Sequence, residues 1–243
     1  MDRLLFTAVS GASRSLSQQE IHANNLANVN TQGFRSDLDN ALTQQVNGEG
    51  YASRYLAQPT QGGVDLSPGA VRETGRDLDI AIKGDGLIAL RSGAREVYTR
   101  NGQIDVNADG ELSVNGLPLE GDNGPIVLPP FSSVSIAEDG VITIVPDDGD
   151  IAAPMDIDRV KLVNIPANEL SKNDAGFLVS NAAFNPRDEE VTVTAGHLEA
   201  ANVSAIGEMV ASIALNRQFE AQIKMMKAAE DLANAGNRLL RGS

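Results

Sequence analysis

The chain has no cysteine and no tryptophan, and aromatic residues make up only 4% of its 243 positions. Without thiols it can form no disulfide, no zinc–thiolate site and no cysteine nucleophile. The scarcity of aromatic residues disfavours a substrate pocket lined by aromatic rings. No stretch reaches the roughly 18 consecutive apolar residues that a transmembrane helix requires. The apolar run near the N-terminus is too short for the hydrophobic region of a signal peptide, so no cleaved signal peptide is expected. A hydrophobic content of 42% is still enough for one or two domains with a buried core.

The net charge of −14 is distributed unevenly along the chain. Residues 1–35 carry three basic and two acidic side chains, and residues 204–243 carry five basic and four acidic side chains. The remaining 27 of the 33 acidic residues lie in 36–203. An acidic middle segment repels phosphate backbones, and therefore nucleic acid is not expected as a partner. The nearly neutral ends can pack against copies of themselves with little Coulomb repulsion.

Both ends show helical periodicity. Near the N-terminus, apolar residues recur at steps of three, four and seven and predict a helix over about 3–29, ended by Gly33; they are Leu5, Val9, Ala12, Leu16, Ala23 and Leu26. The C-terminal segment predicts a helix over about 203–240 with two successive apolar phases, first Val203, Ile206, Val210 and Ile213, then Phe219, Ile223, Met226, Ala233 and Leu240. Arg217 falls where the phase changes, which is the pattern of a coiled-coil stutter.

The middle of the chain changes to the alternation of β-strands. Stretches such as 78–90, 98–116, 134–145 and 158–165 alternate around glycine-containing turns, and Asn101-Gly102, Asp109-Gly110 and Asp139-Gly140 are hairpin signals. Residues 44–76 are rich in Gln, Gly and Ser and indicate an extended linker or loop, and 146–156 indicates an acidic loop. The sequence predicts an α+β protein in which N- and C-terminal helices form a coiled-coil assembly layer around a β-rich middle. The expected divisions are an N-terminal assembly helix (1–35), a linker or loop (36–76), the β-rich domain (77–195) and a C-terminal assembly helix (196–243).

Motifs that resemble catalytic or metal sites fail on their spacing. The stretch 105–112 imitates a calcium-binding loop, but Gly116 stands where the bidentate glutamate is needed, so a hairpin turn is expected instead. Gly84-Asp85-Gly86 lacks the remaining residues of a phosphate-binding loop and is expected to be a tight turn. His22 and His197 have no second ligand at a useful spacing, and no serine lies in a nucleophile motif. We therefore expect no catalytic, metal or cofactor-binding residue and no enzymatic activity.

One local feature is unusual for a helix end. Asn24, Asn25, Asn28 and Asn30 lie within about two turns, although asparagine disfavours helix interiors. Side-chain amides that bond to a neighbouring helix would offset this cost, and a simple helix stop before Gly33 is the alternative.

Four stretches together resemble the family of flagellar axial proteins of the rod and hook. The stretch ANNLANVNTQGFR (23–35) is similar to the family's N-terminal motif, with Thr31, Gly33, Phe34 and Arg35 in matching places. Residues 67–90 and 98–116 resemble its β-domain signature, and 196–226 resembles its C-terminal signature. Ala201 and Leu87-Ile88 depart from the usual pattern, where serine and aromatic residues are common.

The resemblance implies a structural subunit that assembles through its terminal helices into the hollow drive shaft, which transmits motor torque. The length and opening residues favour a proximal-rod member; a distal-rod member, a non-flagellar secreted filament or adhesin, and an enzyme acting on cell-wall glycan remain as alternatives. Expected partners are copies of this chain, other rod subunits and the flagellar type III export apparatus, with a periplasmic location and export without a cleaved signal. The expected assembly interface comprises Leu5, Val9, Leu16, Asn24, Asn25, Leu26, Asn28, Gly33, Phe34, Asn202, Val203, Ile206, Val210, Ile213, Arg217, Phe219, Ile223 and Met226.

Overall fold

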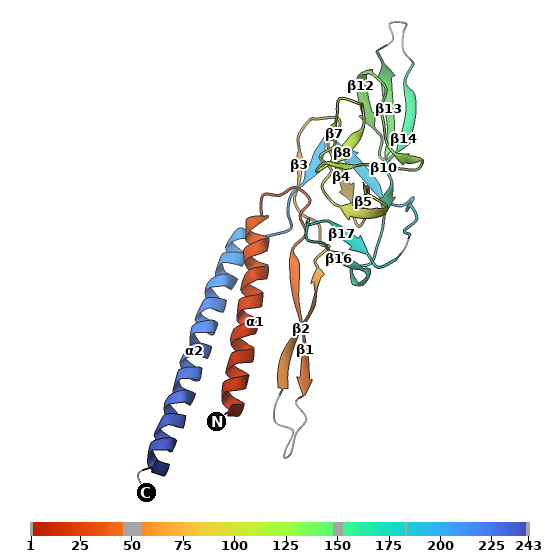
Figure 1. The fold of residues 1–243 in the computed structure, drawn as a ribbon. Coiled ribbons are helices and arrows are strands. Elements are labelled where there is room, and N and C mark those ends of the chain that lie inside the picture. The colour runs from red at the N-terminus through yellow and green to blue at the C-terminus, as the bar shows by residue number, and fades with distance from the viewer. Residues whose placement is uncertain (1, 46–54, 148–152, 183, 242–243) are drawn as a thin grey trace. The chain divides into compact units, whose positions relative to one another are not determined.

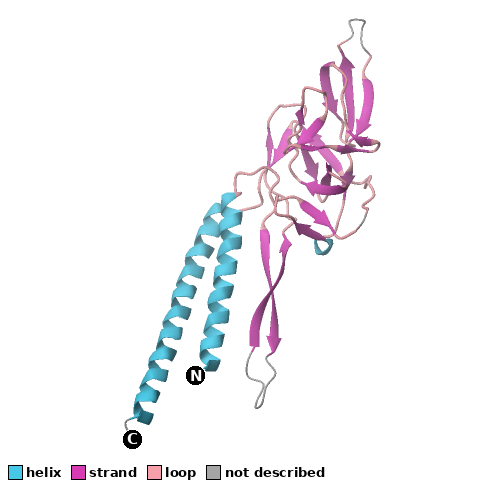
Figure 2. Ribbon diagram, viewed as in Figure 1, coloured by secondary structure: helices cyan, strands magenta, loops and turns pink. Residues whose placement is uncertain are grey.

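Two long helices at the ends of the chain pack side by side in antiparallel orientation (Figures 1 and 2). Helix α1 spans Asp2–Ala27 and helix α2 spans Ala205–Arg241, which confirms both helices predicted from periodicity. Ser204 caps α2, because its Oγ accepts a hydrogen bond from the backbone N–H of Gly207 at 3.3 Å. The computed structural model describes residues 2–45, 55–147, 153–182 and 184–241. Neither helix is long and apolar enough to span a membrane within these ranges.

The chain divides into two units. The helical unit comprises Met1–Ala27, Asp37–Gly62 and Ser204–Ser243, and the β unit comprises Asn28–Ser36 and Gly63–Val203. Two of the four boundaries between the units, after Ala27 and after Ser36, therefore lie within or next to the predicted N-terminal motif. The combination of terminal helices and a strand-rich middle confirms the α+β class.

The segment predicted as a linker contains strands instead. Strands β1 (Asp37–Gln45) and β2 (Tyr55–Val64) pair as a two-stranded sheet. The loop prediction for 44–76 was therefore wrong at 44–45, 55–64 and 71–73, whereas 65–70 and 74–76 lie outside strands; residues 46–54 lie outside the description. Asp39 Oδ2 accepts hydrogen bonds from Arg14 Nη2 at 3.1 Å and Gln18 Nε2 at 2.6 Å, which fastens β1 to α1. These strands were not predicted because their Gln- and Gly-rich sequence shows no apolar alternation.

The β unit is built from short antiparallel sheets. The largest has the order β15-β5-β6-β17-β16, with bounds Leu162–Val163, Leu87–Ser92, Arg95–Thr99, Leu178–Ser180 and Leu170–Lys172. Two three-stranded sheets are β7-β8-β9 (Asp105–Val106, Leu112–Val114, Leu117–Pro118) and β12-β13-β14 (Phe131–Ile136, Val141–Pro146, Met155–Arg159). The two-stranded sheets pair β3 (Val71–Glu73) with β19 (His197–Glu199), β4 (Ile80–Lys83) with β18 (Thr192–Ala195), and β10 (Glu120–Gly121) with β11 (Gly124–Pro125); a short 3₁₀ helix, η1, spans Ala167–Glu169.

The core of the β unit is aliphatic. Its fully buried side chains are mostly isoleucine and leucine contributed by several of these sheets, among them Ile80, Ile88, Leu90, Ile104, Leu112 and Ile142. Branched aliphatic residues pack well on pleated surfaces, which explains how a chain so poor in aromatic residues still builds a dry interior.

Two of the three predicted hairpin turns are confirmed. Asp109-Gly110 joins the paired strands β7 and β8, and Asp139-Gly140 joins β12 and β13. The prediction for Asn101-Gly102 was wrong, because it connects β6 to β7, which do not pair. Gly102 is required there for space: a Cβ would come within 1.7 Å of the carbonyl oxygen of Ile80.

The other local predictions had mixed outcomes. Residues 84–86 form a turn with positive φ at Gly84 and Gly86, as expected, but not a hairpin, since β4 pairs with β18 and β5 with β6 and β15. In the calcium-like stretch, Asn107 Oδ1 accepts hydrogen bonds from the backbone N–H groups of Asp109 and Glu111, which confirms a turn. Of the predicted loop at 146–156, residues 148–152 lie outside those described; the prediction was wrong at Pro146, which ends β13, and at Met155 and Asp156, which begin β14.

Candidate assembly interface

The start of α2 presents an exposed apolar stripe. Ile206, Val210 and Ile213 are 77%, 61% and 54% exposed, and Met209 lies beside them at 51%. Their spacing places them on the side of α2 opposite Leu215, which is buried against α1. The first apolar phase predicted from the sequence therefore lies on the outer face of α2, away from α1. Val203 lies just before the helix and is half-buried.

Small residues of α1 make the contact with α2. Ala8, Ala12 and Ser15 are buried, and a Cβ on Gly11 would come within 2.8 Å of the Gln222 side chain. The larger residues predicted as the seam, Leu5, Val9 and Leu16, remain 41%, 47% and 45% exposed. Only Ala12 of the predicted seam is buried, so most of that seam lies about a quarter of a turn away from the contact within the chain.

The second apolar phase of α2 turns inward. Phe219 and Met226 are half-buried on the side that faces α1, whereas Ile223 is 44% exposed. Arg217, where the phases meet, is exposed. The change of phase thus marks the point where the apolar residues pass from the outer face to the inner face of the pair. The side chain of Leu240 is outside the described part of the chain.

A histidine links the two helices at the other end of the pair. His22 Nδ1 on α1 lies 2.5 Å from Glu208 Oε2 in the first turn of α2. These residues are 186 positions apart, and no local sequence pattern connects them. His197, in contrast, contacts the carbonyl oxygen of Ala195 at 2.8 Å within its own turn.

Two asparagines of the N-terminal motif, Asn25 and Asn28, bond to residues of the same chain. Asn25 is 2% exposed and bonds to both backbone groups of Asp37, accepting from the N–H at 2.9 Å and donating to the carbonyl at 3.1 Å. Asn28 Oδ1 accepts from the Thr31 hydroxyl at 3.1 Å. Asn24 is exposed, and Leu26 is half-buried. For Asn25 the amide bonds to a strand of the same chain rather than to a neighbouring helix.

Gly33 and Phe34 lie in the β unit, close to the segment that precedes α2. Gly33 has φ +65° and donates its N–H to the Glu199 carbonyl at 2.7 Å; a Cβ there would come within 2.1 Å of the Asn101 nitrogen. The ring of Phe34 lies 4.0 Å from Lys172 Nζ in a cation–π contact. Glycine is therefore required at position 33 by both conformation and space.

Asn202 joins the same region from the C-terminal side. Its Oδ1 accepts from the backbone N–H of Ser36 at 2.8 Å, and its Nδ2 donates to the carbonyls of Asp65 at 2.9 Å and Ser67 at 3.1 Å. One side chain thereby connects three chain segments. This bracing role differs from the surface role expected for an assembly residue.

A buried ionic cluster lies beside these residues and was missed from the sequence. Arg35, Arg100 and Glu199 are 2%, 3% and 1% exposed. Glu199 Oε1 accepts from Arg35 Nη2 and from the Gly69 N–H, both at 2.7 Å, and Glu199 Oε2 lies 3.6 Å from Arg100 Nη1. Burial lowers the pKa of Arg100, an effect that the Glu199 carboxylate opposes. Arg35 stands in the N-terminal motif, but nothing in the sequence shows that it meets positions 100 and 199.

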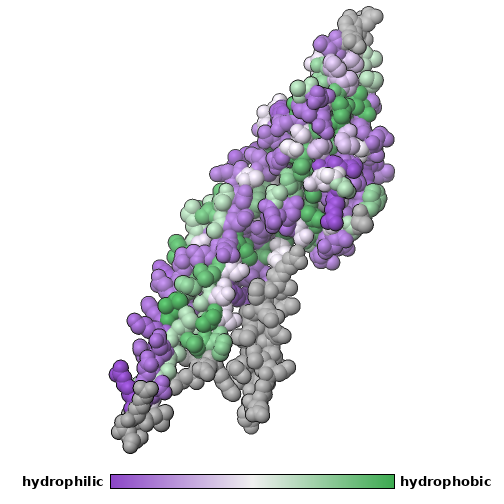
Figure 3. Space-filling model, viewed as in Figure 1, coloured by the Kyte–Doolittle hydropathy of each residue, from purple (hydrophilic) through white to green (hydrophobic). Residues whose placement is uncertain are grey.

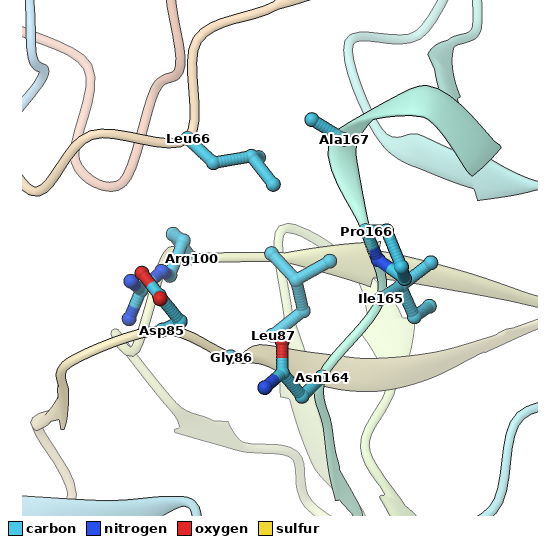
Figure 4. A pocket seen from close by; sticks show the side chains of 9 residues that line it. All are labelled: Leu66, Asp85, Gly86, Leu87, Arg100, Asn164, Ile165, Pro166 and Ala167. Atoms are coloured by element: carbon cyan, nitrogen blue, oxygen red, sulfur yellow. The ribbon is translucent and has the colours of Figure 1, made fainter.

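A cavity in the β unit adjoins Arg100 (Figure 4). It has a volume of about 190 Å³ and is lined mainly by apolar side chains, including Leu66, Leu87 and Ile165, with Asp85 and Arg100 at one end. This volume is below the roughly 300 Å³ at which ligand pockets begin. Its lining includes no histidine and no serine or cysteine nucleophile. Among the described residues no group of three or more His, Cys, Asp or Glu side chains could hold a metal ion.

The fold and the exposed stripes define a class of protein: a structural subunit whose terminal helices carry apolar faces that one chain leaves uncovered. Comparisons with known proteins agree. The family "Flagella basal body rod protein" matches residues 5–35, "Flagellar hook protein FlgE/F/G D1 domain" matches 81–144, and "Flagellar basal body rod FlgEFG protein C-terminal" matches 194–239.

Curated relatives identify the branch of the family. The chain is 36% identical to the flagellar basal-body rod protein FlgF of Escherichia coli (strain K12) and 35% identical to that of Salmonella typhimurium (strain LT2), with 99% of each chain covered. It is 27% identical to the flagellar basal-body rod protein FlgG of Bacillus subtilis (strain 168), with 96% of this chain and 97% of the relative covered. The chain belongs to the flagellar basal-body rod protein FlgF family. It is a structural protein of the rod and not an enzyme.

Proposed function

We propose that this chain is a subunit of the proximal part of the rod and assembles through its terminal helices with copies of itself and with other rod subunits. The observation that carries the proposal is the exposed stripe of Ile206, Val210 and Ile213. Burying one such side chain stabilises a contact by roughly 1.5–3 kcal/mol. Figure 3 shows apolar side chains gathered on the surface of the helix pair, where a neighbouring helix could cover them.

The charge distribution favours contacts between subunits along the terminal helices rather than along the middle segment. The helical ends are nearly neutral, whereas 27 of the 33 acidic residues lie between them. Like charges in the middle segment disfavour close approach there, so contacts between subunits are favoured along the helices. The β unit has its own aliphatic core and does not need a neighbour to bury it. Helices in contact along a shaft would transmit the torque of the motor from one subunit to the next.

The location and route follow from the family resemblance. The proposal includes export by the flagellar type III apparatus without a cleaved signal, followed by assembly in the periplasm. A chain without cysteine cannot be trapped by disulfides on entering an oxidising compartment.

The test replaces the chromosomal gene with a variant carrying Ile213→Asp. An unpaired carboxylate in a helix interface is disfavoured by several kcal/mol. We expect the variant to be exported, to be missing from purified basal bodies by mass spectrometry, and to leave cells unable to swim. The β unit of the purified variant should unfold at the same urea concentration as in the parent chain.

Gln218→Asp provides the matched control, because Gln218 is an exposed polar position on the same helix, on the side away from the stripe. It introduces the same charge and should leave assembly and swimming nearly unchanged. Complete rods and normal swimming with Ile213→Asp would refute assembly through this stripe.

A further inference from the structure

Asparagine is followed by glycine at four places in the chain, Asn47, Asn101, Asn115 and Asn123. An asparagine in this context can lose its side-chain amide without an enzyme. The glycine nitrogen forms a bond to the asparagine Cγ, the Cγ–Nδ2 bond breaks, and the glycine N–H proton leaves with the amide nitrogen as ammonia. Water then opens the cyclic succinimide to aspartate or isoaspartate. Since glycine follows in every case, the fold decides which pair reacts; Asn47 lies outside the described residues.

Burial protects the pair Asn101-Gly102. Asn101 is 5% exposed, its Nδ2 donates to Asn115 Oδ1 at 3.0 Å, and its Oδ1 accepts from the backbone N–H of Gln103 at 3.0 Å. A Cβ on Gly102 would come within 1.7 Å of the Ile80 carbonyl oxygen, so there is no room for the backbone to shift. The side chain of Asn101 cannot turn onto the Gly102 nitrogen without breaking both hydrogen bonds. This pair therefore reacts only after local opening of the fold.

The pair Asn115-Gly116 is exposed but conformationally restrained. It forms the two-residue turn between β8 and β9, in which Val114 pairs with Leu117. Its two residues have φ of +51° and +79°, the combination of a type I′ turn. Ring closure requires the Asn115 Cγ to rotate onto the Gly116 nitrogen, a backbone conformation that this turn does not have. The bond from Asn101 also holds the side chain in place.

The pair Asn123-Gly124 has neither form of protection. It lies where the paired strands β10 and β11 are joined, and Asn123 is exposed. A Cβ on Gly124 would have nothing within 4 Å, so the backbone has space to move. Asn123 Nδ2 donates to Asp158 Oδ1 at 3.4 Å, longer than the roughly 2.7–3.2 Å of an ordinary N–H···O bond. That weak bond restrains the side chain little.

We propose that Asn123 is a site of spontaneous deamidation in the folded chain. The reaction replaces the amide that donates to Asp158 with a carboxylate, so an attraction becomes a repulsion between like charges. The isoaspartate product also lengthens the backbone by one carbon between Gly121 and Gly124, which are partners in the hairpin. Deamidation therefore adds a negative charge to the acidic middle of the chain and loosens the pairing of β10 with β11.

The test incubates the purified full chain at mildly alkaline pH, once folded and once unfolded in guanidinium chloride. Samples taken over time are digested with pepsin in acid, where deamidation during handling is slow, and fragmentation in the mass spectrometer locates each gain of one mass unit. In the folded chain we expect Asn123 to convert several times faster than Asn115 and at least about tenfold faster than Asn101, which depends on local opening. In denaturant the three rates should converge, because no fold remains to separate them.

Asn123→Gln is the matched control, since glutamine keeps the amide but would have to close a larger ring, which forms more slowly. It should abolish the conversion at position 123 and leave the rates at Asn101 and Asn115 unchanged. A folded chain in which Asn101 or Asn115 converts as fast as Asn123 would overturn the proposal. So would an Asn123 that converts in denaturant but stays intact in the folded chain. The same order of rates with and without denaturant would show that the fold does not select the site.

Discussion

Replacing Glu199 with glutamine removes a carboxylate that contacts two buried arginines. Glu199 is 1% exposed, and the guanidinium groups of Arg35 and Arg100 lie 2.7 Å and 3.6 Å from its two oxygens. Glutamine has nearly the same shape and can still accept from the Gly69 N–H. The substitution therefore tests charge rather than packing, and it leaves two positive charges buried beside each other.

We expect Glu199→Gln to lower the free energy of unfolding strongly. Removing one partner from a buried ion pair typically costs about 3–5 kcal/mol, because the remaining charge is left uncompensated. Arg35→Met should be milder than Glu199→Gln, since Arg100 and Glu199 remain as a neutral pair. The predicted order of stability is the parent chain first, Arg35→Met second and Glu199→Gln last.

The assay is urea unfolding of the purified full chain, followed by the near-ultraviolet circular dichroism of its tyrosines. Glu138→Gln is the control, because Glu138 pairs with Lys83 at 3.0 Å but its side chain is 78% exposed. Solvent-exposed ion pairs contribute only about 0–1 kcal/mol to the free energy of unfolding. If Glu199→Gln is no more destabilising than Glu138→Gln, or if Arg35→Met is the worse of the two, the cluster does not stabilise the β unit as we have argued.

Three further predictions concern conformation, order and ionisation. A residue with a Cβ in the left-handed conformation costs roughly 1–2 kcal/mol, and Gly93→Ala, with nothing within 4 Å of the added Cβ, should lower the free energy of unfolding by only that amount. Gly33→Ala has a similar φ but a clashing Cβ, so it should destabilise the β unit by more, and thermal unfolding of the two variants measures the difference. Limited proteolysis of the free chain should trim both helical ends and leave a core within about 28–203, because small interface residues bury little apolar area; full protection of the ends would contradict this. Burial raises the pKa of Tyr98 to about 12, so one of the three tyrosines should ionise late in a spectrophotometric titration. Because the fold holds the neutral phenol, its stabilising effect should be present below pH 10 and decline as the pH rises toward 12.

Several features followed from the sequence because they depend on near neighbours in the chain. Apolar residues at steps of three and four predicted α1 and α2, and alternation predicted a strand-rich middle. Asp109-Gly110 and Asp139-Gly140 predicted two hairpins from the conformations that glycine allows. The motif at 23–35 indicated the flagellar family before any comparison. Each of these signals lies within a window that local backbone preferences control.

The division of the predicted interface could be decided only by the tertiary structure. Periodicity grouped Leu5, Val9 and Leu16 with Ala12, but it could not show that the small residue meets α2 while the large ones stay exposed. The choice depends on which side chains let the helices approach closely, and therefore on the partner helix.

Contacts between residues far apart in the chain could not be predicted from the sequence for a related reason. Arg35, Arg100 and Glu199 are separated by 65 and 99 positions, and no local preference signals that they share one buried site. The strands β1 and β2 likewise depend on pairing with each other, and Asn101-Gly102 resembles a hairpin turn although its flanking strands pair elsewhere. In each case a local pattern is compatible with several partners, and the packing of distant segments selects one of them.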